Sequence, residues 1–149
     1  MAAAVSSSSP ATTSAFMAQE RDVSVMFCDI VGFTTLVEPM TPVQAAFVLN
    51  AFLTRMTDVV FEHEGTLDKF IGDALLAVFG APFDQPQHPL RAVQAALAMR
   101  DALADMNRTG DAPKLQMRIA INTGVALTGD IGSPRRREFT VLGDVVNTA

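Results

Sequence analysis

The sequence predicts an α+β domain in which helices pack on an antiparallel-rich sheet. Three observations predict it: an apolar run that ends in an acid at residues 25–29, long segments with apolar residues at helical spacing, and two short apolar runs joined by a glycine turn. Along the chain they give the order strand, helix, hairpin, helix and strand pair, which is typical of a helical layer on a sheet. The chain has 149 residues, 49% of them apolar, which is enough for one hydrophobic core.

The first strand leads into a candidate site. Residues 25–28 are apolar, Asp29 follows them directly, and the next residues include Gly32, Thr34 and Thr35. An apolar run of this length predicts a buried strand, and the glycine predicts a turn after it. The pattern therefore indicates a strand whose end carries a carboxylate into a loop of the size that holds a phosphate.

The first helical segment begins with strong N-terminal signals. Thr41, Pro42 and Gln44 match an N-cap, a proline at the first helical position and a capping-box glutamine. We expect Gly65 to end this helix as the C′ residue, just beyond its C-cap. The face expected to enter the core consists of Leu49, Phe52, Leu53, Met56 and Val60.

A hairpin follows at residues 66–79, where Gly72 and Asp73 join two apolar runs. This places Asp73 at the tip of the hairpin. A single aspartate in a turn is more often an Asx-turn residue than a ligand. If the hairpin neighbours the first strand, however, Asp29 and Asp73 lie together and would bind a hard divalent cation such as Mg²⁺ or Mn²⁺.

A proline-rich loop leads into a second predicted helix. Its apolar positions are Leu90, Val93 and Leu97, and it continues to Met106 before Gly110 ends it. Apolar and polar residues then alternate over residues 115–122, which predicts a half-buried strand. We expect this strand to turn at residues 123–124 into another at residues 125–127.

Composition restricts the class of partner and the compartment. The net charge is −5, which argues against nucleic acid or an anionic membrane as the general partner, because both require a basic surface. The single Cys28 cannot form an intramolecular disulfide and suits a reducing, cytoplasmic compartment. No apolar run reaches the length of a membrane span, and the N-terminus has no signal-peptide pattern, so we expect neither a membrane anchor nor a signal peptide.

The N-terminal segment differs in composition from the rest of the chain. Residues 1–20 are rich in Ala, Ser and Thr, which predicts a disordered tail before a domain at residues 21–149. We expect the biological start at either Met1 or Met17.

Three charged groups are interpreted as having no site role. Residues 62–64, Glu-His-Glu, diverge by about 100° each on a helix and do not converge on one ion. His88 stands in the proline-rich loop beside no acid or cysteine pattern. Residues 135–137 are three arginines after Gly-Ser-Pro, which predicts an exposed loop with solvated charge rather than a triphosphate contact.

Four segments, in order, resemble the catalytic domain of class III nucleotidyl cyclases, the adenylate and guanylate cyclases. They read Phe-Cys-Asp-Ile-Val-Gly-Phe-Thr at residues 27–34, Lys-Phe-Ile-Gly-Asp-Ala-Leu-Leu-Ala-Val-Phe at residues 69–79, Asn-Thr-Gly at residues 122–124, and Phe-Thr-Val-Leu-Gly-Asp-Val-Val-Asn at residues 139–147. The resemblance covers about residues 21–149. It implies a ferredoxin-like βαββαβ core.

The resemblance also implies a metal and phosphate site. Asp29, Asp73 and the backbone carbonyl of Ile30 would hold two Mg²⁺ or Mn²⁺ ions per site. The amides of Val31, Gly32, Phe33 and Thr34 would donate to phosphate oxygens, with Gly32 allowing close approach of the backbone.

The remaining implied residues select the base and assist the reaction. Lys69 falls where family members select adenine, and its partner position falls on Thr140, whose hydroxyl can accept from N6; ATP is therefore the expected substrate. Asn147 matches the transition-state asparagine that orients the ribose. An arginine four residues further on is expected beyond Ala149, so we expect a catalytic domain that is incomplete at its C-terminus.

In the family, two subunits form the site head to tail. One would supply Asp29 and Asp73, and the other Lys69, Thr140 and Asn147, so we expect a homodimer. The alternatives are a guanylate cyclase and an inactive dimerisation or nucleotide-sensing module. A GGDEF-type diguanylate cyclase and a HAD-type phosphatase fit less well, because Ala74 follows Asp73 where the first would have Glu, and Val31 stands where the second would have an acid.

Overall fold

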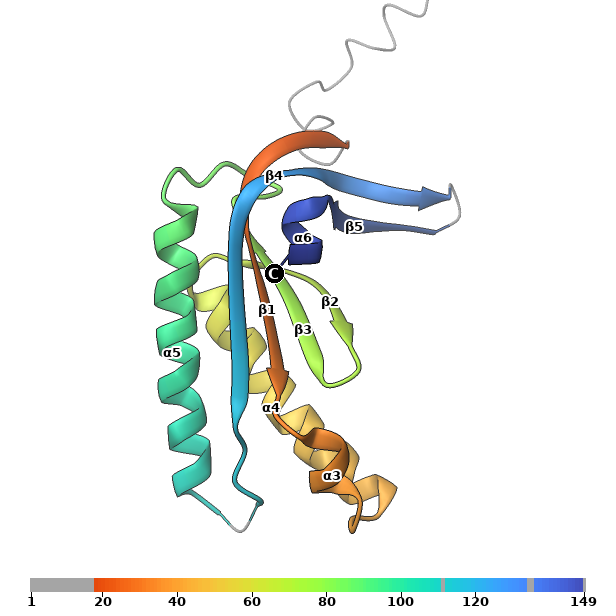
Figure 1. Ribbon diagram of the computed structural model, residues 1–149, viewed down its shortest axis with the longest axis vertical. Coiled ribbons are helices and arrows are strands. Elements are labelled where there is room, and N and C mark those ends of the chain that lie inside the picture. The colour runs from red at the N-terminus through yellow and green to blue at the C-terminus, as the bar shows by residue number, and fades with distance from the viewer. Residues whose placement is uncertain (1–17, 111, 134–135, 149) are drawn as a thin grey trace, which may run out of the picture.

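The computed structural model describes residues 18–110, 112–133 and 136–148, with the side chains of these residues except 130–133, 136–140 and 148. These residues form a five-stranded sheet in the order β2-β3-β1-β4-β5, and every neighbouring pair is antiparallel (Figure 1). The strands are β1 (Gln19–Ile30), β2 (Thr66–Ile71), β3 (Ala74–Phe79), β4 (Met117–Ser133) and β5 (Arg136–Leu142). The predicted antiparallel-rich sheet is confirmed.

Helices lie on both faces of this sheet. They are α3 (Phe33–Val37), α4 (Pro42–Glu62), α5 (His88–Arg108) and α6 (Asp144–Thr148). The long helices α4 and α5 pack on one face, whereas α6 lies against β4 and β5 on the other (Figure 1). The order β1-α4-β2-β3-α5-β4 is the βαββαβ order of the predicted ferredoxin-like core, which is confirmed. None of the described helices combines the length and the apolar character that a membrane crossing requires.

The central strand β1 is buried on both of its faces. Met26 and Cys28 pack in the core beneath α4 and α5, whereas Val23 and Val25 pack in a smaller core beneath α6. Because successive side chains of a strand point to opposite faces, Asp29 lies on the same face as Val25. The acid at the end of β1 therefore faces away from α4 and α5.

The start of α4 is as predicted, but its end differs. Thr41 and Gln44 form the capping box, with distances of 3.2 Å and 3.0 Å between each side chain and the other's backbone amide. At the C-terminus the left-handed residue is Glu64, with φ of 63°, rather than Gly65. Gly65 is needed for space instead: a Cβ there would lie 2.6 Å from the Phe79 ring and 2.7 Å from Val60.

We therefore expect Gly65→Ala to destabilise the domain by at least about 2 kcal/mol, because Phe79 and Val60 are fully buried and cannot yield without repacking the core. Urea unfolding measures this change. Gly124→Ala is the matched control, since its Cβ would meet nothing closer than 3.5 Å, and it should cost less than about 1 kcal/mol. Equal losses in the two variants would contradict this account of Gly65.

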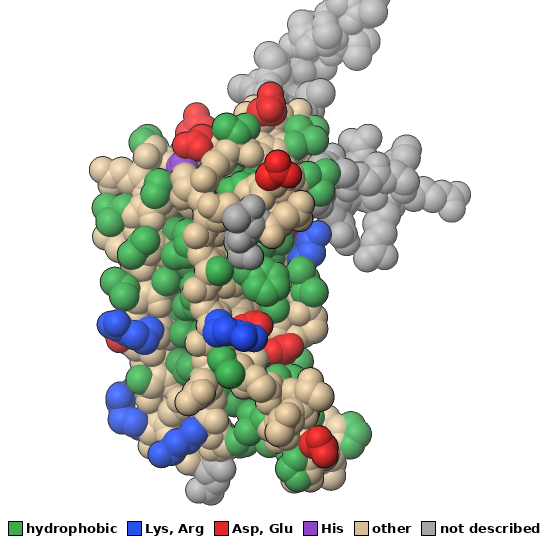
Figure 2. Space-filling model, viewed as in Figure 1, with side chains coloured by type: hydrophobic (Ala, Val, Ile, Leu, Met, Phe, Trp, Pro, Cys, Tyr) green, Lys and Arg blue, Asp and Glu red, His purple; other side chains and the backbone are tan. Residues whose placement is uncertain are grey.

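The second predicted helix exists as α5, but its buried face is not the expected one. Leu90, Val93 and Leu97 are about half exposed, and hydrophobic side chains accordingly appear along the side of the molecule where α5 runs (Figure 2). The face against the sheet consists of Ala92, Ala95, Met99, Ala102 and Leu103. Small alanines let the helix approach the sheet closely, and periodicity alone did not distinguish the two faces.

The predicted strand pair after α5 is also different. No turn occurs at Thr123 and Gly124, because β4 continues through both residues. Its first part pairs with β1, and its second part, from Leu127 onward, pairs with β5.

Two predicted element boundaries also differ in the structure. Residues 136–137, expected in a loop, begin β5, and residues 19–20, expected in the N-terminal tail, begin β1; the tail up to residue 17 lies outside the described residues.

Candidate functional site

The two predicted metal acids come together at one end of the sheet. In the pairing of β1 with β3, Asp29 lies opposite Ala74, which is the residue directly after Asp73. The two-residue turn at Gly72 and Asp73, in which Gly72 has φ of 61°, therefore ends beside the last residues of β1. The hairpin is the neighbour of the first strand, as the metal-site prediction required.

A basic residue that the sequence analysis missed pairs with Asp29. Arg118 lies opposite Asp29 on β4, and its Nε and Nη2 donate to the two carboxylate oxygens at 3.2 Å and 3.1 Å. This hydrogen-bonded pair, the charge of Asp29 and the charge of Asp73 raise the pKa of Arg118. The alternation of residues 115–122 placed Arg118 on the polar side of its strand, but the register that brings it to Asp29 depends on the fold.

The donor set at this end of the sheet suits a hard cation. Two carboxylates and the main-chain carbonyl of Ile30, the last residue of β1, are all oxygen ligands. Mg²⁺ is typically held by one or two carboxylates while substrate phosphates and water complete its shell. Among the described residues no three His, Cys, Asp or Glu side chains gather to hold a metal, so a cation here would depend on the substrate for part of its coordination.

The predicted phosphate loop is only partly available. The amide of Val31 donates to the carbonyl of Gln116 at 2.8 Å, so it is already bonded within the chain in this structure. Gly32 has φ of 64° and precedes α3 as its N-cap. The amides of Phe33 and Thr34 stand in the first turn of α3, where a helix offers no internal acceptor. The loop thus presents donors at Phe33 and Thr34 beside Asp29.

The other predicted site residues lie away from these acids within one chain. Lys69 is exposed on the outer strand β2, opposite Leu76, and shares the α6 face of the sheet. Thr140 of β5 pairs with Gly129 of β4, and the side chain of Thr140 is not among those that the structure describes. Asn147 is exposed on α6. Asn122 of β4 bonds that helix. It lies opposite Val25, which is four residues, or about 13 Å, from Asp29 along β1.

The thiol of Cys28, beside this site, stays protonated at neutral pH. Burial and the neighbouring Asp29 charge raise the pKa of its thiol to about 12. The folded chain therefore keeps this proton in alkali, whereas the unfolded chain loses it above about pH 8.5. Since the unfolded state then binds fewer protons, stability falls as the pH rises.

We expect the free energy of unfolding to decrease above pH 8.5 by up to about 1.4 kcal/mol per pH unit. Urea unfolding between pH 8 and pH 10.5 measures the slope. The chain has no tyrosine, so Cys28→Ala should remove most of this slope even though it leaves a small cavity. An unchanged slope in Cys28→Ala would assign the alkaline loss to other groups.

His88, set aside by the sequence analysis, is a buried structural residue. Its Nδ1 lies 2.8 Å from the Ser24 hydroxyl, and its Nε2 lies 3.3 Å from a carboxylate oxygen of Asp22. Ser24 in turn bonds the hydroxyl of Thr123 at 2.7 Å. This polar chain ties the start of α5 to β1 and β4 beneath the helices, on the face opposite Asp29.

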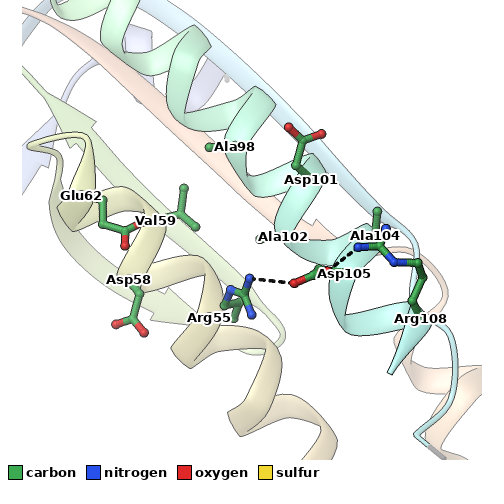
Figure 3. Close-up of a pocket in the computed structure, with 10 residues that line it drawn as sticks. All are labelled: Arg55, Asp58, Val59, Glu62, Ala98, Asp101, Ala102, Ala104, Asp105 and Arg108. Atoms are coloured by element: carbon green, nitrogen blue, oxygen red, sulfur yellow. Dashed lines mark hydrogen bonds and ion pairs between the residues drawn. The ribbon is translucent and has the colours of Figure 1, made fainter. Parts of the chain in front are cut away.

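A wide groove between α4 and α5 holds none of the predicted site residues (Figure 3). It is lined by alanines of α5 and by charged side chains, of which Asp105 pairs with Arg55 at 3.6 Å and also with Arg108. By contrast, a hollow at the sheet face that points away from α4 and α5, called the open face here, is lined by Phe27, Asp29, Arg118, Ile119 and Ala120. The predicted metal site therefore lies on the open face and not in the helical groove.

Comparison with known proteins identifies the family. Residues 16–149 match the family model described as the adenylate and guanylate cyclase catalytic domain. The chain belongs to this cyclase family.

Among similar cyclases, adenylate cyclase 1 of Rhizobium meliloti is 34% identical over 89% of this chain and 20% of that protein. The guanylyl cyclase Cya2 superimposes with a TM-score of 0.83 and 39% identity, over 88% of this chain and 68% of that one. The adenylyl cyclase CyaB of P. aeruginosa gives a TM-score of 0.80 and 32% identity, over 89% and 71%. This cyclase domain spans about a fifth of the length of the curated relatives it matches.

Proposed function

We propose that this chain is the catalytic domain of an adenylate cyclase, which converts ATP to 3′,5′-cyclic AMP and pyrophosphate. The observation that carries the proposal is the register of Asp29 opposite Ala74, which sets Asp29 and Asp73 at one end of the sheet beside the Gly32 turn. Membership of the cyclase family supports the reaction class, and Lys69 supports the choice of base.

The reaction forms a bond between the ribose 3′-oxygen and the α-phosphorus and breaks the bond to the bridging oxygen of the β-phosphate, while the hydroxyl proton is lost to solvent. Asp29, Asp73 and the Ile30 carbonyl would hold two Mg²⁺ or Mn²⁺ ions, which supply Lewis-acid activation of the hydroxyl and charge neutralisation of the phosphates when bound. The amides of Phe33 and Thr34 donate to phosphate oxygens. Arg118 donates to Asp29 in this structure; with a cation bound to Asp29, its guanidinium would be available to bind a phosphate oxygen of the substrate.

Base selection follows from donor and acceptor patterns. Adenine presents an acceptor at N1 and a donor at N6, so the ammonium of Lys69 suits N1 and the hydroxyl of Thr140 suits N6. Guanine presents the reverse pattern at these positions and would leave Lys69 facing a donor. We therefore propose ATP rather than GTP as the substrate.

A complete site needs two copies of the chain. Asn147 stands on α6, about 13 Å along the sheet from Asp29, and Lys69 lies two strands away from β1. Both nevertheless belong to the same open face of the sheet. Head-to-tail pairing of two such faces would bring Asp29 and Asp73 of one subunit to Lys69, Thr140 and Asn147 of the other, with two equivalent sites per dimer.

Turnover at high protein concentration with Mn²⁺ and either ATP or GTP, with products resolved by chromatography, tests the proposal. We expect cyclic AMP, and we expect Lys69→Glu to lower the ATP:GTP turnover ratio by about 100-fold because a carboxylate accepts from guanine and repels adenine N1. Lys114→Glu, an exposed lysine before β4, is the matched control and should leave the ratio unchanged. Cyclic GMP from the unaltered chain would favour the guanylate alternative, and metal-dependent nucleotide binding without product would favour an inactive module.

A further inference from the structure

The segment Asn122-Thr123-Gly124 has no role in the site as described, although it is one of the segments that carry the family resemblance. It lies in the middle of β4, so its side chains alternate between the two faces of the sheet. Asn122 and Gly124 face α6, whereas Thr123 faces the helical layer and bonds Ser24. The segment thus contacts α6 on one face and the buried Ser24–His88 pair on the other.

Asn122 bonds the backbone of α6 directly. Its Nδ2 donates to the carbonyl oxygen of Val145 at 3.0 Å. Val145 is buried in the smaller core, and Gly124 lies beneath it, where an added Cβ would come 3.5 Å from the Val145 side chain. Val146 also packs against this core, so the helix is held to the sheet by the side chains of Val145 and Val146 and by a hydrogen bond to its main chain.

The short α6 depends on such contacts. It spans five residues, and the amides of Val146 and Asn147 bond the Gly143 carbonyl at 3.1 Å and 3.4 Å. A helix of this length is not stable by its own hydrogen bonds, so tertiary contacts decide where it lies. The other face of β4 is fixed at the same point by the Thr123–Ser24 bond at 2.7 Å and the Ser24–His88 bond at 2.8 Å. Asn122 therefore projects from a rigid part of the sheet.

We propose that Asn122 is a positioning residue, which sets the orientation of α6 and thereby the place of Asn147, two residues after the carbonyl that it holds. The role of Asn147 in this statement rests on the proposed function. Asn122 does not touch the substrate. Its effect on turnover passes through α6, because a small displacement of a group that orients a reactant lowers the rate strongly.

Hydrogen exchange tests the structural half of the proposal without reference to activity. In Asn122→Ala we expect the amides of Val146 and Asn147 to exchange at least about tenfold faster. Asn122→Asp, which keeps the shape but replaces the donor by an acceptor, should do the same. The matched control is Asn107→Ala, which removes two side-chain bonds to the Leu115 backbone, at 2.8 Å and 2.9 Å, far from α6. Unchanged α6 exchange in Asn122→Ala, or an equal increase in Asn107→Ala, would overturn the proposal.

A double-mutant cycle tests the functional half. We expect Asn122→Ala to lower kcat about tenfold with nucleotide affinity changed less than about twofold, and to have little further effect when Asn147 is already Ala. Additive losses in the two variants would mean that Asn122 acts elsewhere. If Asn147→Ala alone leaves kcat unchanged, the assigned role of Asn147 fails, and the exchange experiment still decides whether Asn122 holds α6.

Discussion

Asp29→Asn is expected to lower cyclic nucleotide formation at least about 100-fold, and Asp73→Asn to do the same, because each removes one of the two carboxylates at the end of the sheet. An amide keeps the shape of the side chain but lacks the charge that holds a divalent cation. Turnover with Mn²⁺ at saturating nucleotide measures the loss.

The structure predicts that these losses are not losses of fold. Asp29 pairs with Arg118, whose side chain is 69% exposed, so an unpaired Arg118 is solvated by water. The melting temperature of Asp29→Asn should therefore remain close to that of the unaltered chain. Asp58→Asn removes an equivalent charge from the exposed side of α4 and should retain full turnover. Retention of more than a tenth of the activity in Asp29→Asn would contradict the metal assignment.

Mixing two inactive variants is expected to restore activity. Asp73→Asn damages the half-site that carries the acids, and Asn147→Ala damages the half-site that carries α6. In a head-to-tail heterodimer of the two, one site combines both changes and the other is intact. Random pairing of equal amounts makes half of the dimers mixed, so about a quarter of the unaltered turnover should return.

The matched control for the mixing experiment pairs Asp73→Asn with Asp29→Asn. Both changes then lie in the same half-site, every dimer has two damaged sites, and no activity should return. Sedimentation of the mixture at the assay concentration establishes that dimers are present. If dimers form and the first mixture stays at the level of its parents, the site lies within one chain and the shared-site proposal fails.

Local chemistry in the sequence was sufficient for most of the elements. The buried run that becomes β1, the capping box of α4 and the glycine turn of the hairpin each depend on a few neighbouring residues. For the same reason the sequence could predict the local placement of the two candidate metal acids. Asp29 and Asp73 are each placed by the strand or turn beside them.

Register and helix orientation required the fold. The sequence placed Arg118 on a polar strand face, but only the pairing of β4 with β1 brings it to Asp29. The apolar stripe at Leu90, Val93 and Leu97 suggested that this face of α5 is buried. Instead the alanine-rich face packs on the sheet, because small side chains allow a closer approach. The predicted turn at Thr123 and Gly124 was wrong because both residues pair with β1, opposite Ser24 and Val23, and this pairing keeps the strand extended.

The sequence by itself determined the family and predicted site residues such as Asp29 and Asp73, because short segments with their own local geometry carry both. Only the tertiary structure decided which of these residues are neighbours. Asp29 and Asp73 meet because antiparallel pairing aligns the end of β1 with the start of β3. Asn147 lies apart from them because Asn122 and Val145 hold α6 further along the sheet, and contacts between residues distant in the chain leave no local pattern in the sequence.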